Sequence, residues 1–130
     1  MELMLADFVK AQNLRPWQPG IVDCSLVLAD WAIWLGRPDP ASHLRGRYDS
    51  EDGFRRIIDI EGGLLPVIEN CVARIGGRRS GLAAGAIGVI GARANINRQW
   101  GAIFDGSRWL VRFVDGFGSM TANALAIWEI

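Results

Sequence analysis

The chain has few of the residues on which metal and cofactor chemistry most often depend. It contains two cysteines, Cys24 and Cys71, and one histidine, His43. Two cysteines are too few for a disulfide framework, and their spacing is not that of a zinc site. We therefore expect no metal, no cofactor, and synthesis in a reducing cytosol.

Long hydrophobic runs and an excess of charge are also missing. No run of about 18 apolar residues is present, so no membrane span is expected. Residues 1–5 lack the basic start and continuous apolar stretch of a secretory signal. Fourteen basic and fourteen acidic residues cancel, which makes nucleic acid an improbable partner by charge alone.

What is present suffices for a folded core. Half of the 130 residues are hydrophobic and 22% are charged, a composition that argues against disorder. The length fits one domain, and we expect a single domain spanning residues 1–130. The six tryptophans can fill the core or lie on contact surfaces, where tryptophan is enriched.

The first part of the chain predicts helices. They are expected over Met1–Asn13, Cys24–Leu35, Asp39–Arg45, Glu51–Ile60 and Leu64–Ile75. The second of these is apolar on nearly every side, which is typical of a buried central helix. Ser50 is a plausible N-cap for the helix that follows it.

The pattern changes after a glycine-rich basic segment at residues 76–81, which we expect to be a flexible link. Short apolar runs then predict strands over Ala86–Ile90, Trp100–Phe104 and Trp109–Val114. Residues 123–130 are ambiguous between helix and strand. Helices followed by strands predict an α+β fold, with N-terminal helices packed on a small C-terminal antiparallel sheet.

Asp23-Cys24-Ser25 is the motif most suggestive of chemistry. It places Cys24 near the first turn of the apolar helix, where unpaired backbone N–H groups can lower a thiol pKa. A thiolate is the form that attacks carbonyl carbon. The alternatives are that Cys24 packs as a small hydrophobe and that Asp23 caps the helix.

These residues resemble the NlpC-type cell-wall cysteine peptidases, a papain-like family whose nucleophile commonly sits in Asp-Cys-Ser-Gly. The family's strand His-Val-Gly-Ile-Tyr is similar to residues 99–104, Gln-Trp-Gly-Ala-Ile-Phe. The resemblance covers roughly residues 17–113. It implies a papain-like fold in which Cys24, at the start of the central helix, faces the strand that carries Gln99.

The same resemblance shows where the catalytic set departs from the family. The position of the family base holds Gln99, and a glutamine cannot take a proton near neutral pH. The orienting position falls near Val111, which has no polar atom, and Leu26 replaces the family glycine. The implied protein is a degenerate peptidase, with His43 the only histidine that could return to Cys24. The alternative is that His43 has no catalytic role and is simply an exposed residue on a short helix.

Three further segments are similar to small proteins encoded among phage and prophage tail genes. They are Asp39-Pro40-Ala41, Leu44-Arg45-Gly46-Arg47-Tyr48 and Gly62-Gly63-Leu64. That likeness implies a protein made in the bacterial cytoplasm, located in the virion tail, and bound to other tail proteins.

We expect one of two functions, and a third is a weaker alternative. The first is a structural protein of a phage or phage-like tail tip. The second is an active peptidoglycan-cleaving hydrolase with Cys24 as nucleophile, and the third is a groove that binds peptidoglycan peptide without cutting it. The candidate catalytic positions are Cys24 and Gln99. The candidate binding residues are Asp23, Ser25, Trp17 and Trp100.

Overall fold

The computed structural model describes residues 2–130, and the side chains from Met4 onward. Its helices are α1 (Glu2–Asn13), α2 (Leu26–Trp34), α3 (Glu51–Glu61) and α4 (Leu64–Arg74). Its strands are β1 (Arg78–Arg79), β2 (Ile87–Gly91), β3 (Gln99–Phe104), β4 (Trp109–Phe113), β5 (Gly116–Met120) and β6 (Ala124–Glu129). A short 3-10 helix covers Ile96–Arg98. Met1, the first residue of the first expected helix, lies outside the described residues.

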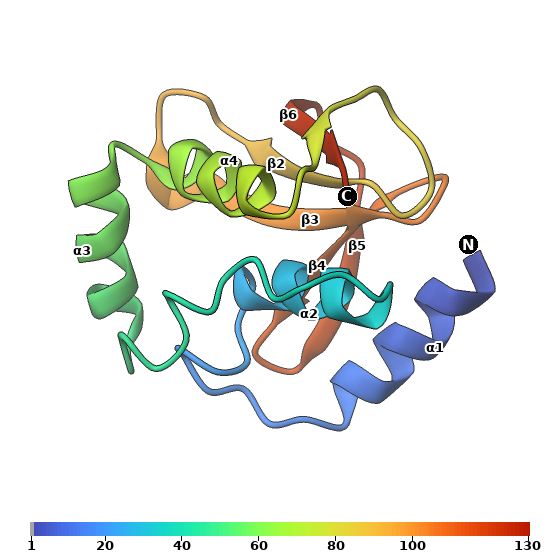
Figure 1. The fold of residues 1–130 in the computed structure, drawn as a ribbon, viewed down its shortest axis with the longest axis horizontal. Coiled ribbons are helices and arrows are strands. Elements are labelled where there is room, and N and C mark those ends of the chain that lie inside the picture. Colours follow the sequence, from blue (N-terminus) through green and yellow to red (C-terminus); the bar gives the residue numbers. More distant parts are fainter. Residues whose placement is uncertain (1) are drawn as a thin grey trace.

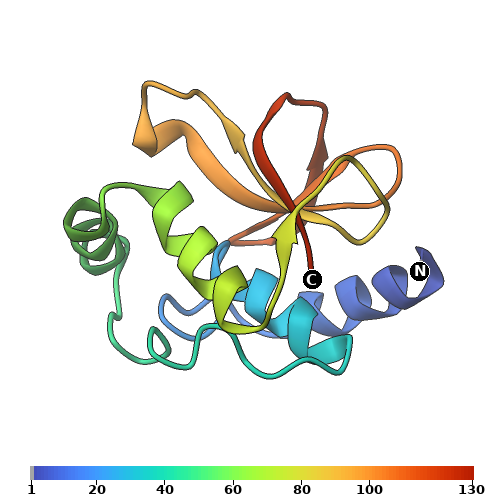
Figure 2. The ribbon, with the colours of Figure 1, turned by 45° about the horizontal axis from the view of Figure 1, so that its top comes forward.

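The six strands form one antiparallel sheet in the order β1-β6-β2-β3-β4-β5. The last strand in the chain, β6, therefore lies between β1 and β2. Figures 1 and 2 show the helices gathered on one side of the strands, with α2 near the middle. The α+β class predicted from the sequence, with helices first and strands later, is confirmed.

Local signals explain the helix ends that the sequence predicted well. The Ser50 hydroxyl accepts a hydrogen bond of 3.0 Å from the Gly53 amide at the start of α3, as an N-cap should. Gly62 ends the same helix in the left-handed conformation, with a φ of 90°. A glycine is needed there because a Cβ is strained at that φ.

The expected helix over Asp39–Arg45 is wrong, because this segment forms turns. Asp39 does accept a hydrogen bond from the Ala41 amide, as a cap would. The Arg45 guanidinium, however, reaches back to the Asp39 and Asp30 carboxylates, at 2.7 and 2.8 Å. These tertiary ion pairs compete with a helix only a turn or two long, which is marginal by itself.

One expectation about the second half needs correction, and one ambiguity is resolved. The basic segment at residues 76–81 is not a free link, since Arg78 and Arg79 form β1 and pair with β6. The ambiguous C-terminal segment is strand β6 rather than helix. Strand β5 was not predicted at all, because its Gly-Phe-Gly-Ser-Met sequence carries two glycines and little apolar alternation.

The core lies between α2 and the sheet. Trp31 on α2 is fully buried, and its indole N–H donates to the Gly85 carbonyl oxygen at 2.8 Å. Trp109 and Trp128 are also buried, while Trp17, Trp34 and Trp100 keep exposed surface. Trp128 thus belongs to the domain's own core. The core-filling alternative is therefore confirmed for three of the tryptophans, and a contact role for the other three stays a prediction.

Ion pairs tie the turn segment, residues 39–48, to α2. Asp30 of α2 lies 2.8 Å from Arg45 and 3.1 Å from Arg15. The Gly46 amide also donates to the Gly20 carbonyl oxygen, at 3.0 Å. The turn segment and the loop before α2 are therefore held together, and both reach the site described next.

Candidate functional site

The Asp23 carboxylate organises the loop before α2. One oxygen accepts from the Ser25 and Leu26 amides at 3.0 and 2.8 Å. The other accepts from the Gly20 amide at 2.9 Å and from the Tyr48 hydroxyl at 2.6 Å. With four donors and 5% exposure, this carboxylate has no free face for a ligand. Its role is to cap the start of the helix.

Tyr48 joins the two stretches of sequence that were singled out separately. Its hydroxyl donates to Asp23, so the Leu-Arg-Gly-Arg-Tyr segment is bonded to the Asp-Cys-Ser motif. Burial, with the Asp23 charge next, raises the pKa of Tyr48, which keeps the hydroxyl a donor. Gly20 is required beneath it, because a Cβ there would lie 2.0 Å from the Tyr48 carbonyl oxygen.

Cys24 does not have the environment of an activated nucleophile. It precedes α2 by two residues, and the amides of the next two residues, Ser25 and Leu26, donate to the Asp23 carboxylate rather than to the thiol. Burial raises the pKa of Cys24 to about 11, and the Asp23 charge adds to the rise. The expected lowering of this pKa is wrong, since the helix start serves the carboxylate instead of the thiol.

Cys24 nevertheless opens onto a cavity of about 420 Å³. All six sequence-derived candidates line it: Trp17, Asp23, Cys24, Ser25, Gln99 and Trp100. Strand β3 passes close to the cysteine, since a Cβ placed on Gly101 would lie 3.2 Å from the Cys24 carbonyl oxygen. The prediction that Cys24 faces the strand carrying Gln99 is thus confirmed.

A base is missing from this arrangement. The Gln99 amide nitrogen donates to the carbonyl oxygens of Ala92 and Arg93, at 3.0 and 3.2 Å. Val111 is fully buried in the apolar cluster that also contacts Cys24, so nothing polar stands behind the thiol on that side. The side chains that line the cavity therefore include no imidazole, and apart from Asp23 the acidic groups among them, Glu51 and Asp59, come from α3 rather than from the strands behind Cys24.

His43 does not supply the missing base. It is half-buried in the turn segment and is not part of the cavity lining. Its Nδ1 atom is buried without a hydrogen-bond partner among the described residues. Desolvation, with the Arg74 charge next, lowers the pKa of His43 and so favours the neutral ring.

Sequence reasoning missed two contributors to the cavity. One is α3, which brings Glu51, Arg55 and Asp59 to the opposite wall. The other is Arg112, 2% exposed, which donates to the backbone oxygens of Gln12, Arg15 and Phe113. Burial, with the nearby Arg15 charge next, lowers the pKa of Arg112. A single arginine in the apolar strand Trp109–Phe113 was the available signal, because such a residue must be satisfied when buried.

The described residues, 2–130, offer no group of three His, Cys, Asp or Glu side chains able to hold a metal ion. Across the same residues, no helix is long and apolar enough to cross a membrane.

Comparisons with known proteins identify a family but no activity. A family model described as a domain of unknown function, DUF6950, matches residues 1–130. The match covers the whole chain, so the chain belongs to that family. In comparisons with curated proteins and with solved structures, nothing matches.

Proposed function

We propose that this chain is a degenerate NlpC-like domain without hydrolytic activity, acting as a structural component of a phage or phage-like tail tip. The observation that carries the loss of activity is the Cys24 cavity, which holds a cysteine but no histidine and has Gln99 at the position of the family base. The likeness of residues 39–48 and 62–64 to tail-encoded proteins carries the tail assignment.

The papain-like part of the proposal has geometric support. A cysteine just before a buried helix faces an antiparallel sheet, and the position equivalent to the family base lines the same cavity. Helices precede strands along the chain, as that family's order requires. These features favour common descent with the peptidases over chance, because they bring the same few positions together.

The alternative, an active peptidoglycan hydrolase, would need a proton acceptor beside Cys24. Gln99 cannot accept the proton, and its amide already donates to two carbonyls. General acid–base assistance is worth roughly a hundred- to ten-thousandfold in rate. A thiol with a pKa of about 11 supplies little thiolate near neutral pH to offset that loss.

The first test measures hydrolysis directly. Purified wild-type protein and Cys24→Ala are incubated with peptidoglycan, and released peptides are counted by mass spectrometry. We expect both to equal the no-protein blank, and Gln99→His alone not to create activity, because Val111 offers its ring no partner. Release that depends on Cys24 would contradict the loss of activity and favour the hydrolase.

The second test concerns location. Particles from a bacterium that carries the gene are purified by density, and their proteins are identified by mass spectrometry. We expect this chain to co-purify with the tail at low copy number. If it stays in the soluble fraction and binds no tail protein, the structural role is wrong.

A second candidate function is binding of a wall peptide without cleavage. The specific observation in its favour is the retained cavity, lined by Trp17 and Trp100 beside the acidic Glu51 and Asp59. Saturable binding of soluble wall peptides, weakened by Trp100→Ala and not by Cys24→Ala, would support this candidate.

A further inference from the structure

The connection between β2 and β3 forms part of the cavity wall. We call residues 92–98 the strap. Ile96 and Asn97 of the strap line the Cys24 cavity. In Figures 1 and 2 the strap lies on the same side of the molecule as the junction of α3 and α4. Access to this side of the cavity therefore depends on where the strap sits.

The Gln99 side chain joins the two ends of the strap. This residue begins β3, directly after the strap, and its amide nitrogen donates to the first two strap carbonyls, those of Ala92 and Arg93. A primary amide has two N–H donors, so both are used here. One backbone bond, from the Ala92 amide to the Arg98 carbonyl oxygen at 2.9 Å, joins the same two ends.

Ile96, inside the strap, anchors this segment to the core. Its half-buried side chain packs against the main core cluster. Its terminal carbon lies 3.8 Å from where a Cβ on Gly63 would stand, at the junction of α3 and α4. The strap thus crosses from the sheet to the helices and closes the gap between them.

The other hydrogen bonds of the strap are internal to it: the Asn95 amide donates to the Ala92 carbonyl oxygen at 3.2 Å, and the Arg98 amide donates to that of Asn95 at 2.9 Å. Ala92, Arg93, Ala94, Asn95, Asn97 and Arg98 are all exposed. Segments with little buried apolar area and solvent-exposed hydrogen bonds are the ones that open locally at low cost. The two bonds from Gln99 are the side-chain hydrogen bonds that join this exposed segment to β3, beside the backbone bond from Ala92 to Arg98.

We propose that Gln99 is a latch: its side-chain amide holds the strap closed over the Cys24 cavity, and loss of those two bonds opens the cavity. This places Gln99 as a positioning residue at the site where the family keeps its base. The proposal goes beyond the proposed function and does not depend on it, since the latch operates whether or not the domain sits in a tail.

The test compares the reactivity of the two cysteines. Cys24 lies in the cavity, and Cys71 on α4 lies outside its lining. Burial raises the pKa of both thiols in the same direction, so Cys71 serves as the internal reference, and each thiol is compared with itself between wild type and variant. Iodoacetamide labelling of each is followed by mass spectrometry, and hydrogen exchange of residues 92–98 is measured alongside.

Two variants distinguish the effect of losing the Gln99 hydrogen bonds from the effect of adding a charge. Gln99→Met keeps the length and loses the donors, while Gln99→Glu keeps the shape and becomes an acceptor only. We expect both to raise the Cys24 labelling rate roughly three- to tenfold relative to Cys71, and to speed exchange in the strap. The control pair, Gln18→Met and Gln18→Glu, alters an exposed glutamine and should leave both readouts at the wild-type level.

Three results would overturn the latch. An unchanged Cys24 rate in both variants would show that the strap does not limit access. An effect in Gln99→Glu but not in Gln99→Met would assign the change to charge. An equal rise at Cys71 would assign it to general destabilisation of the fold.

Discussion

At the scale of single residues, Asp23 decides what its neighbour Cys24 can do. A cysteine peptidase uses a helix start to stabilise a thiolate. Here the amides at that start, of Ser25 and Leu26, donate to the Asp23 carboxylate. The same carboxylate places a negative charge beside the thiol, so desolvation and charge both raise the pKa of Cys24. Capping of the helix and activation of the cysteine are therefore in competition.

The raised pKa makes a prediction about pH. A thiol with a pKa of about 11 is ionised to roughly one part in ten thousand at pH 7. Because the thiolate is the reactive form, the rate of Cys24 alkylation should rise roughly tenfold per pH unit between about pH 7 and 9. Mass spectrometry after timed labelling measures this rate. N-acetylcysteine, whose thiol is unperturbed, is the control and should level off near its own pKa. A Cys24 alkylation rate that levels off below about pH 8 would contradict the raised pKa of this thiol.

At the scale of elements, the turn segment at residues 39–48 has a structural role that its ion pairs explain. Arg45 bridges Asp30 on α2 and Asp39 at the start of the turn segment. Its Nε and Nη2 atoms both donate, and the planar guanidinium suits this geometry. Tyr48 then docks the end of the segment on Asp23. The turn segment thus positions the loop that carries Cys24, which does not require it to touch a ligand.

The Arg45 bridge predicts that a lysine cannot replace the arginine. Arg45→Lys keeps the charge but loses the fork that spans two carboxylates, so we expect unfolding free energy to fall by about 1–2 kcal/mol. Arg47→Lys is the matched control, since that side chain is exposed, and should change stability by less than about 0.5 kcal/mol. Urea denaturation measures both. Equal stability of the two variants would remove the bridge as the explanation of how the turn segment is held.

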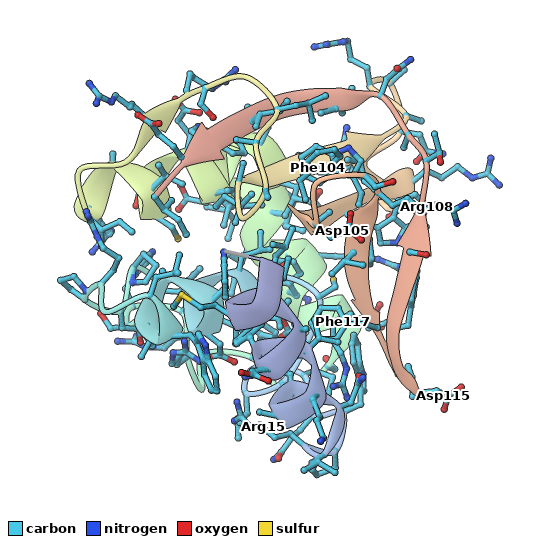
Figure 3. The ribbon with its side chains drawn as sticks, turned by 90° about the vertical axis from the view of Figure 1, so that its right-hand side faces the viewer. Arg15, Phe104, Asp105, Arg108, Asp115 and Phe117 are labelled. Atoms are coloured by element: carbon cyan, nitrogen blue, oxygen red, sulfur yellow. The ribbon has the colours of Figure 1, made fainter. Side chains whose placement is uncertain are left out.

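Strand β5 shows how an element can be set by its neighbours alone. Its sequence carries little strand signal, yet it pairs with β4 over five residue pairs. The Phe117 amide on its outer side donates to the Asn13 side chain at the end of α1, 3.0 Å away. Phe117 also packs on Phe8 of α1, and Figure 3 shows Phe117 beside that helix, with Asp115 at the hairpin tip. Contacts across about a hundred residues of sequence thus stabilise this strand.

At the scale of the whole molecule, strand β6 connects the short edge strand β1 to the rest of the sheet. It pairs with β1 on one side and with β2 on the other. Trp128 on β6 is 1% exposed, and its indole N–H donates to Glu69 on α4 at 2.8 Å. The Arg79 guanidinium of β1 lies over the same ring, 5.0 Å from its centroid. One side chain therefore contacts the helical layer and the edge of the sheet.

Truncation of the Trp128 side chain should destabilise the whole domain. We expect Trp128→Ala to lower the unfolding free energy by about 3–5 kcal/mol, through lost burial and a cavity. Trp34→Ala is the matched control, because Trp34 is 45% exposed and should cost about 1–2 kcal/mol. Thermal and urea unfolding, followed by near-ultraviolet circular dichroism, measure the difference. Equal losses would mean that β6 does not join the sheet as described.

The sequence by itself determined the four helices, three of the strands and the α+β class. These features depend on local periodicity, caps and glycines, which act over a few neighbouring residues. The structure also bears out the sequence-based alternative that Asp23 caps the helix. This follows from the cost of leaving the amides of a helix end unsatisfied.

Only the tertiary structure decided the state of the thiol, the turn at residues 39–48, and the strands β1 and β5. The pKa of Cys24 depends on which groups share the first amides of α2 and on how much water the fold removes from the sulfur. The strands depend on partners far along the chain, as when β6 pairs Arg78 and Arg79. The role of Gln99 also belongs here, because its amide finds its acceptors only once β2 and β3 have paired. Each of these depends on distances between residues that sequence spacing does not set.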